Sequence, residues 1–162
     1  MGWSIKSETS PVAKPCAGIE QVWAQMDAII SKKNGIVTHF ELNNEDMGIG
    51  LFMSIVYQDL VDLPFVDLTV DNPDVLGWLV EIESSQRPSA WLARSAGSGE
   101  PINVFVHPTA RVFRKKIIIE RSELATILPL VMDGVTEVEG YEWLDEQLFL
   151  DLDLTMRRGA LL

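Results

Sequence analysis

Apolar side chains first recur at helical spacing and later at a period of two. Between residues 18 and 34 they fall three and four positions apart and form one stripe, made of Ile19, Val22, Trp23, Met26, Ile29 and Ile30. The pair Asn34-Gly35 then favours a left-handed stop. This pattern predicts a helix whose apolar stripe faces the core rather than a cofactor.

Most of the later apolar segments are short and either alternate or are apolar on both faces, which predicts strands. The predicted strands are 36–42, 51–57, 65–70, 78–82, 90–93, 102–106 and 117–119, with an opening strand at 3–6 and a half-buried final strand at 148–154. Ser122 is a suitable N-cap for a second helix, which Pro129 should kink or end. Together these elements predict an α+β fold, with a mostly antiparallel, meandering sheet and two helices packed on one face. We expect a single domain over residues 1–162, because no linker or repeat divides the chain.

Composition places the chain among globular, acidic proteins. Of its 162 residues 47% are apolar and 23% are charged, and 13 Lys and Arg against 24 Asp and Glu give a net charge of −11. Nucleic acids and anionic membranes attract cationic surfaces, so direct binding to either is not expected. The single cysteine, Cys16 in a loop-like stretch, allows no intrachain disulfide. No apolar run has the length of a membrane span or a signal peptide, so we expect a cytoplasmic protein.

Acidic and basic side chains are separated into blocks. Residues 34–86 contain ten acids and no Lys or Arg, and residues 122–156 contain nine acids and again no base. Between them, residues 87–121 carry seven basic groups against two acids. The basic surplus can pair with only part of these carboxylates. We therefore expect an exposed negative face that attracts a cationic partner, the alternative being a surface that only keeps the protein soluble.

Motifs for catalysis and metal binding are missing from the sequence. His39 and His107 lack metal-ligand spacing, and the Gly-Ser-Gly at 97–99 is typical of a turn rather than of a phosphate-binding loop. Asp151 and Asp153 would share one side of the predicted final strand and could hold a divalent cation, although a solvated strand face explains the same spacing. We expect no metal, no cofactor and no enzymatic activity.

The order of the predicted elements resembles that of a known protein family. After the first helix come a Gly-containing turn with an apolar strand at 47–55, a strand at 101–106, a helix after Ile119 and an acidic segment with Glu142-Trp143. Over residues 19–144 this order resembles the Imm1-type immunity proteins of bacterial polymorphic toxin and contact-dependent inhibition systems. The resemblance implies a non-enzymatic inhibitor that binds one cognate toxin domain and blocks its active site. Such toxins often attack nucleic acid with a cationic site, which agrees with the charge blocks.

The expected partner is therefore a toxin protein domain with a basic surface. The contact surface would come from residues 41–83 and 137–153. Its candidate residues are carboxylates that steer the partner and two aromatic anchors: Glu41, Asp46, Tyr57, Asp59, Asp62, Asp67, Glu142, Trp143 and Asp145. Two alternatives stay open, namely an adaptor or chaperone for a basic secreted effector and a small metal-dependent hydrolase that uses Asp151 and Asp153.

Overall fold

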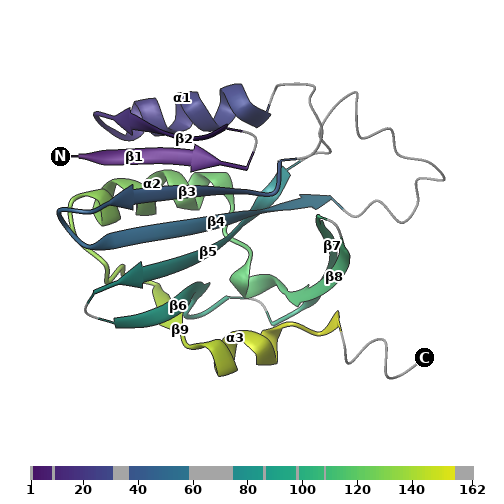
Figure 1. Ribbon diagram of the computed structural model, residues 1–162. Helices are drawn as coiled ribbons and strands as arrows, with labels where there is room; N and C mark the ends of the chain where they lie inside the picture. The colour runs from purple at the N-terminus through teal and green to yellow at the C-terminus, as the bar shows by residue number, and fades with distance from the viewer. Residues whose placement is uncertain are drawn as a thin grey trace.

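The computed structural model describes residues 2–155 except 9, 31–36, 59–74, 86, 98 and 108. This part of the chain forms one open antiparallel sheet of nine strands, with three α-helices and one short 3-10 helix (Figure 1). The strands are β1 (Trp3–Ser7), β2 (Ser10–Cys16), β3 (His39–Asn44), β4 (Ile49–Gln58), β5 (Val75–Ser84), β6 (Arg87–Arg94), β7 (Pro101–Val106), β8 (Thr109–Arg114) and β9 (Tyr141–Leu144). The helices are α1 (Ile19–Ile30), the 3-10 helix η1 (Lys115–Ile117), α2 (Arg121–Met132) and α3 (Glu146–Leu152).

Hydrogen bonds order the strands β2-β1-β3-β4-β5-β6-β9, and the hairpin β7–β8 joins the sheet through the end of β4. Strands β3 to β6 are sequential neighbours and form a meander. β4 pairs with β3, β5 and β7, so it is the central strand. The outermost strand β2 contains Pro11 and Pro15, which have no amide donor.

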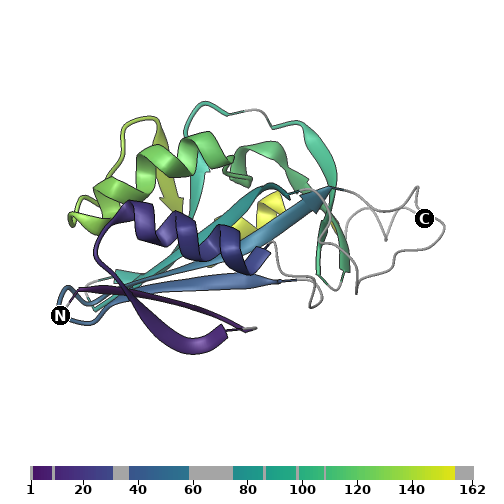
Figure 2. The same ribbon diagram turned by 90° about the horizontal axis from the view of Figure 1, so that it is seen from above.

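Buried side chains on the two faces of the central strands belong to two different hydrophobic clusters. The larger cluster contains Phe40, Met53 and Val80 together with buried side chains from both α1 and α2, which contact each other (Figure 2). Neighbouring positions along a strand point to opposite faces. Leu79 and Val56 accordingly belong to the smaller cluster, to which β7, β8 and α3 also contribute. Among the described residues, these elements cover one half of the second sheet face, and the side chains of the other half, over β1, β3, β4 and β5, stay partly exposed.

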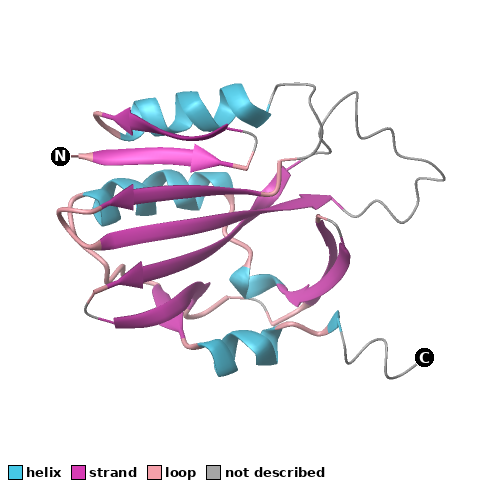
Figure 3. Ribbon diagram, in the orientation of Figure 1, coloured by secondary structure: helices cyan, strands magenta, loops and turns pink. Residues whose placement is uncertain are grey.

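The mixed α+β class and the antiparallel sheet are confirmed, whereas the predicted final strand at 148–154 is wrong. Most of that segment is α3, at the opposite border of the sheet from α1 (Figure 3). The carboxylate of Asp145 accepts a hydrogen bond from the Leu148 amide at 2.9 Å and caps the helix. Phe149 and Leu152, three residues apart, pack on the smaller cluster, while Leu148 is 50% exposed. The alternating leucines therefore do not mark a buried strand face.

The predicted strand at 117–119 is also wrong. The chain forms η1 there, followed by a single β-bridge in which Trp78 and Ile119 exchange backbone hydrogen bonds of 2.8 Å. This close approach requires glycine at position 77, because a Cβ on Gly77 would lie 2.5 Å from the Ile119 carbonyl oxygen. The segment thus closes onto β5 by one contact rather than by a ladder.

Helix α2 starts one residue before the predicted cap and continues past its proline. Glu120, not Ser122, is the N-cap, and its carboxylate and that of Glu123 form a reciprocal capping box with the backbone. The helix runs through Pro129 to Met132. Of the two effects predicted for Pro129, an end of the helix at this residue is wrong, and a kink stays a prediction.

Three strands were not predicted, and some predictions fall outside the described residues. β2 includes residues 14–16 of the stretch 14–18 expected as a loop, and β8 and β9 lack a clear apolar pattern. The predicted strand at 65–70 and the predicted helix stop at 34–35 lie in the undescribed segments.

A polar network ties β6, η1, α2 and β9 together. The guanidinium of Arg94 donates to both carboxylate oxygens of Glu123 and to the backbone carbonyls of Lys115 and Ile118, at 3.0 and 2.8 Å. The Tyr141 hydroxyl donates to the same carboxylate at 2.9 Å. Burial alone would raise the pKa of Glu123, but these hydrogen bonds outweigh it and lower that pKa.

Candidate protein-binding face

The half of the second sheet face that lies over β1, β3, β4 and β5 is lined by partly exposed side chains. We call this surface the outer face; it comprises Ser4, Lys6, Glu41, Asn43, Gly50, Phe52, Glu81 and Glu83. The strand register aligns these residues in two rows, Ser4–Asn43–Gly50–Glu83 and Lys6–Glu41–Phe52–Glu81. Directly opposite residues in antiparallel strands have Cβ atoms about 5 Å apart. Each row therefore forms a continuous band across four strands.

The outer face is hollowed where the first row crosses β4. A depression of about 130 Å³ lies over Gly50 and is bordered by Asn43, Phe52, Glu81 and Glu83. Asn43 packs closely over Gly50, and a Cβ at position 50 would lie 2.7 Å from the Asn43 Oδ1 atom, so this close packing requires glycine.

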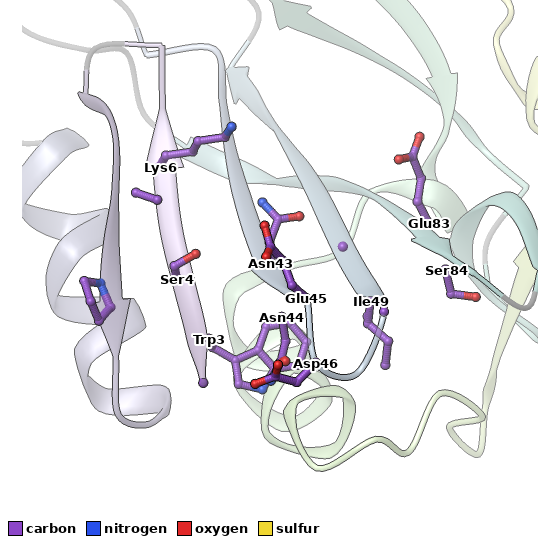
Figure 4. Close-up of a pocket in the computed structure, with 15 residues that line it drawn as sticks. Trp3, Ser4, Lys6, Asn43, Asn44, Glu45, Asp46, Ile49, Glu83 and Ser84 are labelled. Carbon is purple, nitrogen blue, oxygen red and sulfur yellow. The ribbon is translucent and has the colours of Figure 1, made fainter.

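The hollow continues into a larger groove of about 700 Å³ that reaches the β3–β4 turn (Figure 4). Figure 4 shows Lys6 on one flank, Glu83 on the other, and Glu45 and Asp46 toward the turn. The outer face is therefore concave and carries more carboxylates than ammonium groups.

The carboxylates of the outer face are not equivalent. Glu41 lies 3.7 Å from the Lys6 ammonium, so its charge is balanced locally. Burial raises the pKa of Glu81, and the negative charges of Glu83 and Glu146 raise it further. Within the described part of the chain, neither Glu81 nor Glu83 has an ion-pair partner; Glu83 accepts a hydrogen bond from a serine hydroxyl. The β5 side of the outer face therefore holds unbalanced negative charge.

An aromatic pair borders this charge. The His39 ring stacks on the Phe52 ring, with 4.3 Å between centroids and 19° between planes. The Glu8 carboxylate accepts hydrogen bonds from the backbone amides of Thr38 and His39 and lies 3.4 Å from the His39 Nδ1 atom. These contacts fix the start of β3 and hold one face of the Phe52 ring against His39.

Comparison with known proteins adds no relative from which a role could be transferred. No family model, no curated protein and no solved structure matches this chain. Geometry and charge are therefore what indicate its function.

The candidate contact residues predicted from the first acidic block are only partly brought together. Glu41 lies on the outer face, and Asp46 lines its groove at the β3–β4 turn. Three other carboxylates, Asp59, Asp62 and Asp67, lie outside the described residues.

The prediction of Tyr57 as a surface anchor needs correction. Tyr57 is 0% exposed, and its hydroxyl donates to the backbone carbonyl of Val37. It belongs to the larger hydrophobic cluster because it follows the apolar alternation of β4 into the core. Tyr57 is therefore a core residue that a partner does not reach in this conformation.

The candidates from the second acidic block lie at the opposite border of the sheet. Glu142 is exposed on β9, 3.9 Å from the Lys116 ammonium, and Asp145 caps α3. Trp143 packs against the larger cluster and donates from Nε1 to the Thr136 carbonyl at 2.6 Å. Trp143 therefore points away from the outer face. Strands β4, β5 and β6 separate β9 from the Glu41 strand β3, so these residues are not brought together with Glu41.

Sequence reasoning did not single out Glu81, Glu83, Glu146 or Phe52 as site residues. Glu81 and Glu83 alternate with the buried Val80 and Ile82, and this signal predicts that they share one strand face. Their position beside Phe52 depends on the pairing register of β4 and β5, which no local pattern specifies. The charge of Glu146 acts on Glu81 because α3 replaces the predicted strand.

The structure changes the other chemical candidates as well. Asp151 lies on α3 and Asp153 just beyond it, 3.4 Å from an Arg111 nitrogen, so they do not share a strand face as the hydrolase alternative assumed. Among the described residues, no three His, Cys, Asp or Glu side chains gather as metal ligands would. The thiol of Cys16 is buried, which raises its pKa and disfavours the nucleophilic thiolate. None of the described helices has the length and apolar character needed to span a bilayer.

Proposed function

We propose that this chain is an immunity protein that binds a cognate toxin domain and covers its cationic active site with the outer face. The observation that carries the proposal is the unbalanced negative charge on a concave, uncovered sheet face, at Glu81 and Glu83. A toxin that acts on nucleic acid needs a cationic cleft, and carboxylates can occupy such a cleft in place of phosphates. The protein would act by occupancy, without chemistry of its own, in the cytoplasm where the toxin would act.

Two kinds of charge would contribute to binding. The overall charge of −11 would speed the encounter with a basic partner. The outer-face carboxylates would then fix the orientation, because Glu81 and Glu83 have no ion-pair partner among the described residues, whereas Glu41 has Lys6. Association should therefore slow as salt rises, since the Debye length is only about 8 Å at physiological ionic strength.

The direct test uses the toxin domain encoded next to this gene in its host. We expect co-expression of this chain to restore growth to cells that produce that domain, and the purified proteins to form a complex. Capture without growth rescue would contradict inhibition and point to an adaptor. If the toxin domain is not captured and growth is not restored, at low or physiological salt, the proposal is refuted.

A matched pair of charge reversals locates the contact surface. Glu83→Lys with Glu146→Lys changes one exposed acid of the outer face and one close to it, whereas Glu20→Lys with Asp133→Lys changes exposed acids on α1 and after α2. Glu146 and Glu20 are both first-turn acids, so the helix-terminus cost is similar. Because both variants have the same net charge, we expect about a tenfold loss of affinity in the first only. Equal losses would show that total charge, not the outer face, drives binding.

A further inference from the structure

We propose that the depression over Gly50 is a recognition site for one arginine side chain of the protein partner. This inference rests on the proposed function only in taking the partner to be a protein with a basic surface. The depression combines a cavity, an aromatic ring and carboxylates in one place, on the open part of the outer face.

The shape of the depression suits a planar group of a few atoms. Its volume is about 130 Å³, roughly four times the ~30 Å³ share of one water molecule in the liquid, and a guanidinium group has four heavy atoms. Phe52 and Gly50 are two residues apart on β4 and therefore share a face. His39 covers one face of the Phe52 ring, and the depression, which Phe52 and Gly50 both line, offers room beside that ring for a second planar group.

The hydrogen-bond acceptors around the depression complete the match. Glu83 lies directly opposite Gly50, and Glu81 lies directly opposite Phe52. Asn43, on the other side of Gly50, places its Oδ1 atom over the glycine. A guanidinium presents five N–H donors in a plane, so it can stack on the ring and donate to carboxylates at its edge.

Charge and geometry favour arginine over the other possible occupants. A second copy of this chain would bring a further net charge of −11 to the same face, and a nucleic acid would bring phosphates. A lysine ammonium has the right charge but is a compact, strongly hydrated point charge that does not stack in a plane. The aromatic wall formed by Phe52 therefore favours an arginine side chain over a lysine side chain.

The test uses small probes on the isotope-labelled full-length protein. Amide chemical shifts are followed by NMR during titration with acetyl-arginine amide, acetyl-lysine amide and acetyl-citrulline amide; citrulline has the shape of arginine without its charge. We expect saturable shifts for arginine centred on Gly50, Phe52, Glu81 and Glu83, and weaker binding of the other two probes. Shifts of equal size with citrulline, or shifts spread over all acidic residues, would overturn the proposal.

Two variants separate charge from stacking. Glu81→Gln with Glu83→Gln should weaken arginine binding about tenfold, as expected for the loss of two partly exposed charge pairs. Phe52→Leu should weaken arginine binding while leaving lysine binding nearly unchanged. The control Glu20→Gln with Asp133→Asn removes the same charge from exposed positions on α1 and after α2 and should keep arginine binding. A control that loses binding as strongly as Glu81→Gln with Glu83→Gln would contradict a local site.

The outcomes for the two proposals are distinguishable. If the toxin domain is captured but acetyl-arginine amide does not bind at Gly50, this inference fails and the proposed function stands. If the amide binds as described but no toxin domain is captured or neutralised, the site stands and the proposed function fails.

Discussion

Replacing Arg94 by methionine tests whether the polar network is a main support of the fold. Arg94 and Glu123 are only 20% and 18% exposed, and the guanidinium makes four hydrogen bonds, two to Glu123 of α2 and two to backbone carbonyls in and just after η1. Methionine keeps much of the side chain's length and apolar contact but leaves the Glu123 carboxylate without its counter-ion. Breaking a fully buried pair costs roughly 3–5 kcal/mol and an exposed one at most about 1 kcal/mol. For this partly buried pair we expect a loss of about 3 kcal/mol in the free energy of unfolding.

The chain offers a matched control for this experiment. Arg121 of α2 forms a bidentate salt bridge with Asp27 of α1, in which its two guanidinium nitrogens donate to the two carboxylate oxygens at 2.7 and 2.8 Å. The two side chains are 54% and 51% exposed, so Arg121→Met should cost about 1 kcal/mol or less, including the loss of the contact with the Trp23 ring. Urea unfolding followed by circular dichroism measures both variants. Equal losses for Arg94→Met and Arg121→Met would refute the reasoning from burial.

The pH dependence gives an independent check on the same pair. The network lowers the pKa of Glu123 in the folded state, so its stabilisation is complete above the ordinary carboxyl pKa and disappears as the pH falls through the lowered value. The difference in unfolding free energy between wild type and Arg94→Met should therefore shrink in acid. A difference that stays constant from neutral pH into strong acid would contradict the assignment.

Two further substitutions and one control probe the core and the sheet. Gly77→Ala should destabilise by about 1–3 kcal/mol because its methyl group would meet the Ile119 carbonyl, whereas Gly99→Ala, with open space around it, should be nearly neutral in urea unfolding. Tyr57→Phe should cost about 1 kcal/mol through the lost hydrogen bond to Val37. Burial, followed by the charge of Glu8, raises the pKa of Tyr57, so this hydroxyl stabilises the fold below the ordinary tyrosine pKa of about 10 and loses that effect at higher pH. Absorbance at alkaline pH should show Tyr57 ionising only as the protein unfolds; normal titration in the folded state would contradict its burial.

Sequence patterns predict those helices and strands that bury a continuous apolar face. The stripe from Ile19 to Ile30 predicts α1, and the apolar run at 51–57 predicts the central strand β4, because both bury a continuous surface. β2 escapes prediction because most of its side chains are exposed, and it forms only through backbone pairing with β1. α3 is mistaken for a strand because its leucines fall at every second position, although the capping carboxylate of Asp145 signals a helix start.

The geometry of the candidate site could not be predicted from the sequence, for a different reason. Alternation predicts that Glu41 and Glu81 both face solvent, but each is local information about one strand. Their arrangement on either side of Phe52 is a property of the register, in which β4 pairs with β3 on one side and with β5 on the other. The acidic character of the surface is therefore predictable, and its geometry becomes visible only once the strands are paired.

The prolines of β2 have a consequence for the behaviour of the protein at high concentration. An outermost strand is normally a template on which further chains add, and Pro11 and Pro15 remove two of the donors that such growth requires. Lys14, exposed on the same strand, adds a charge that discourages stacking. The proposed inhibition by occupancy would require at least one copy of this chain for each copy of its target. An edge strand that does not template fibril growth would let the protein accumulate to that concentration without aggregating.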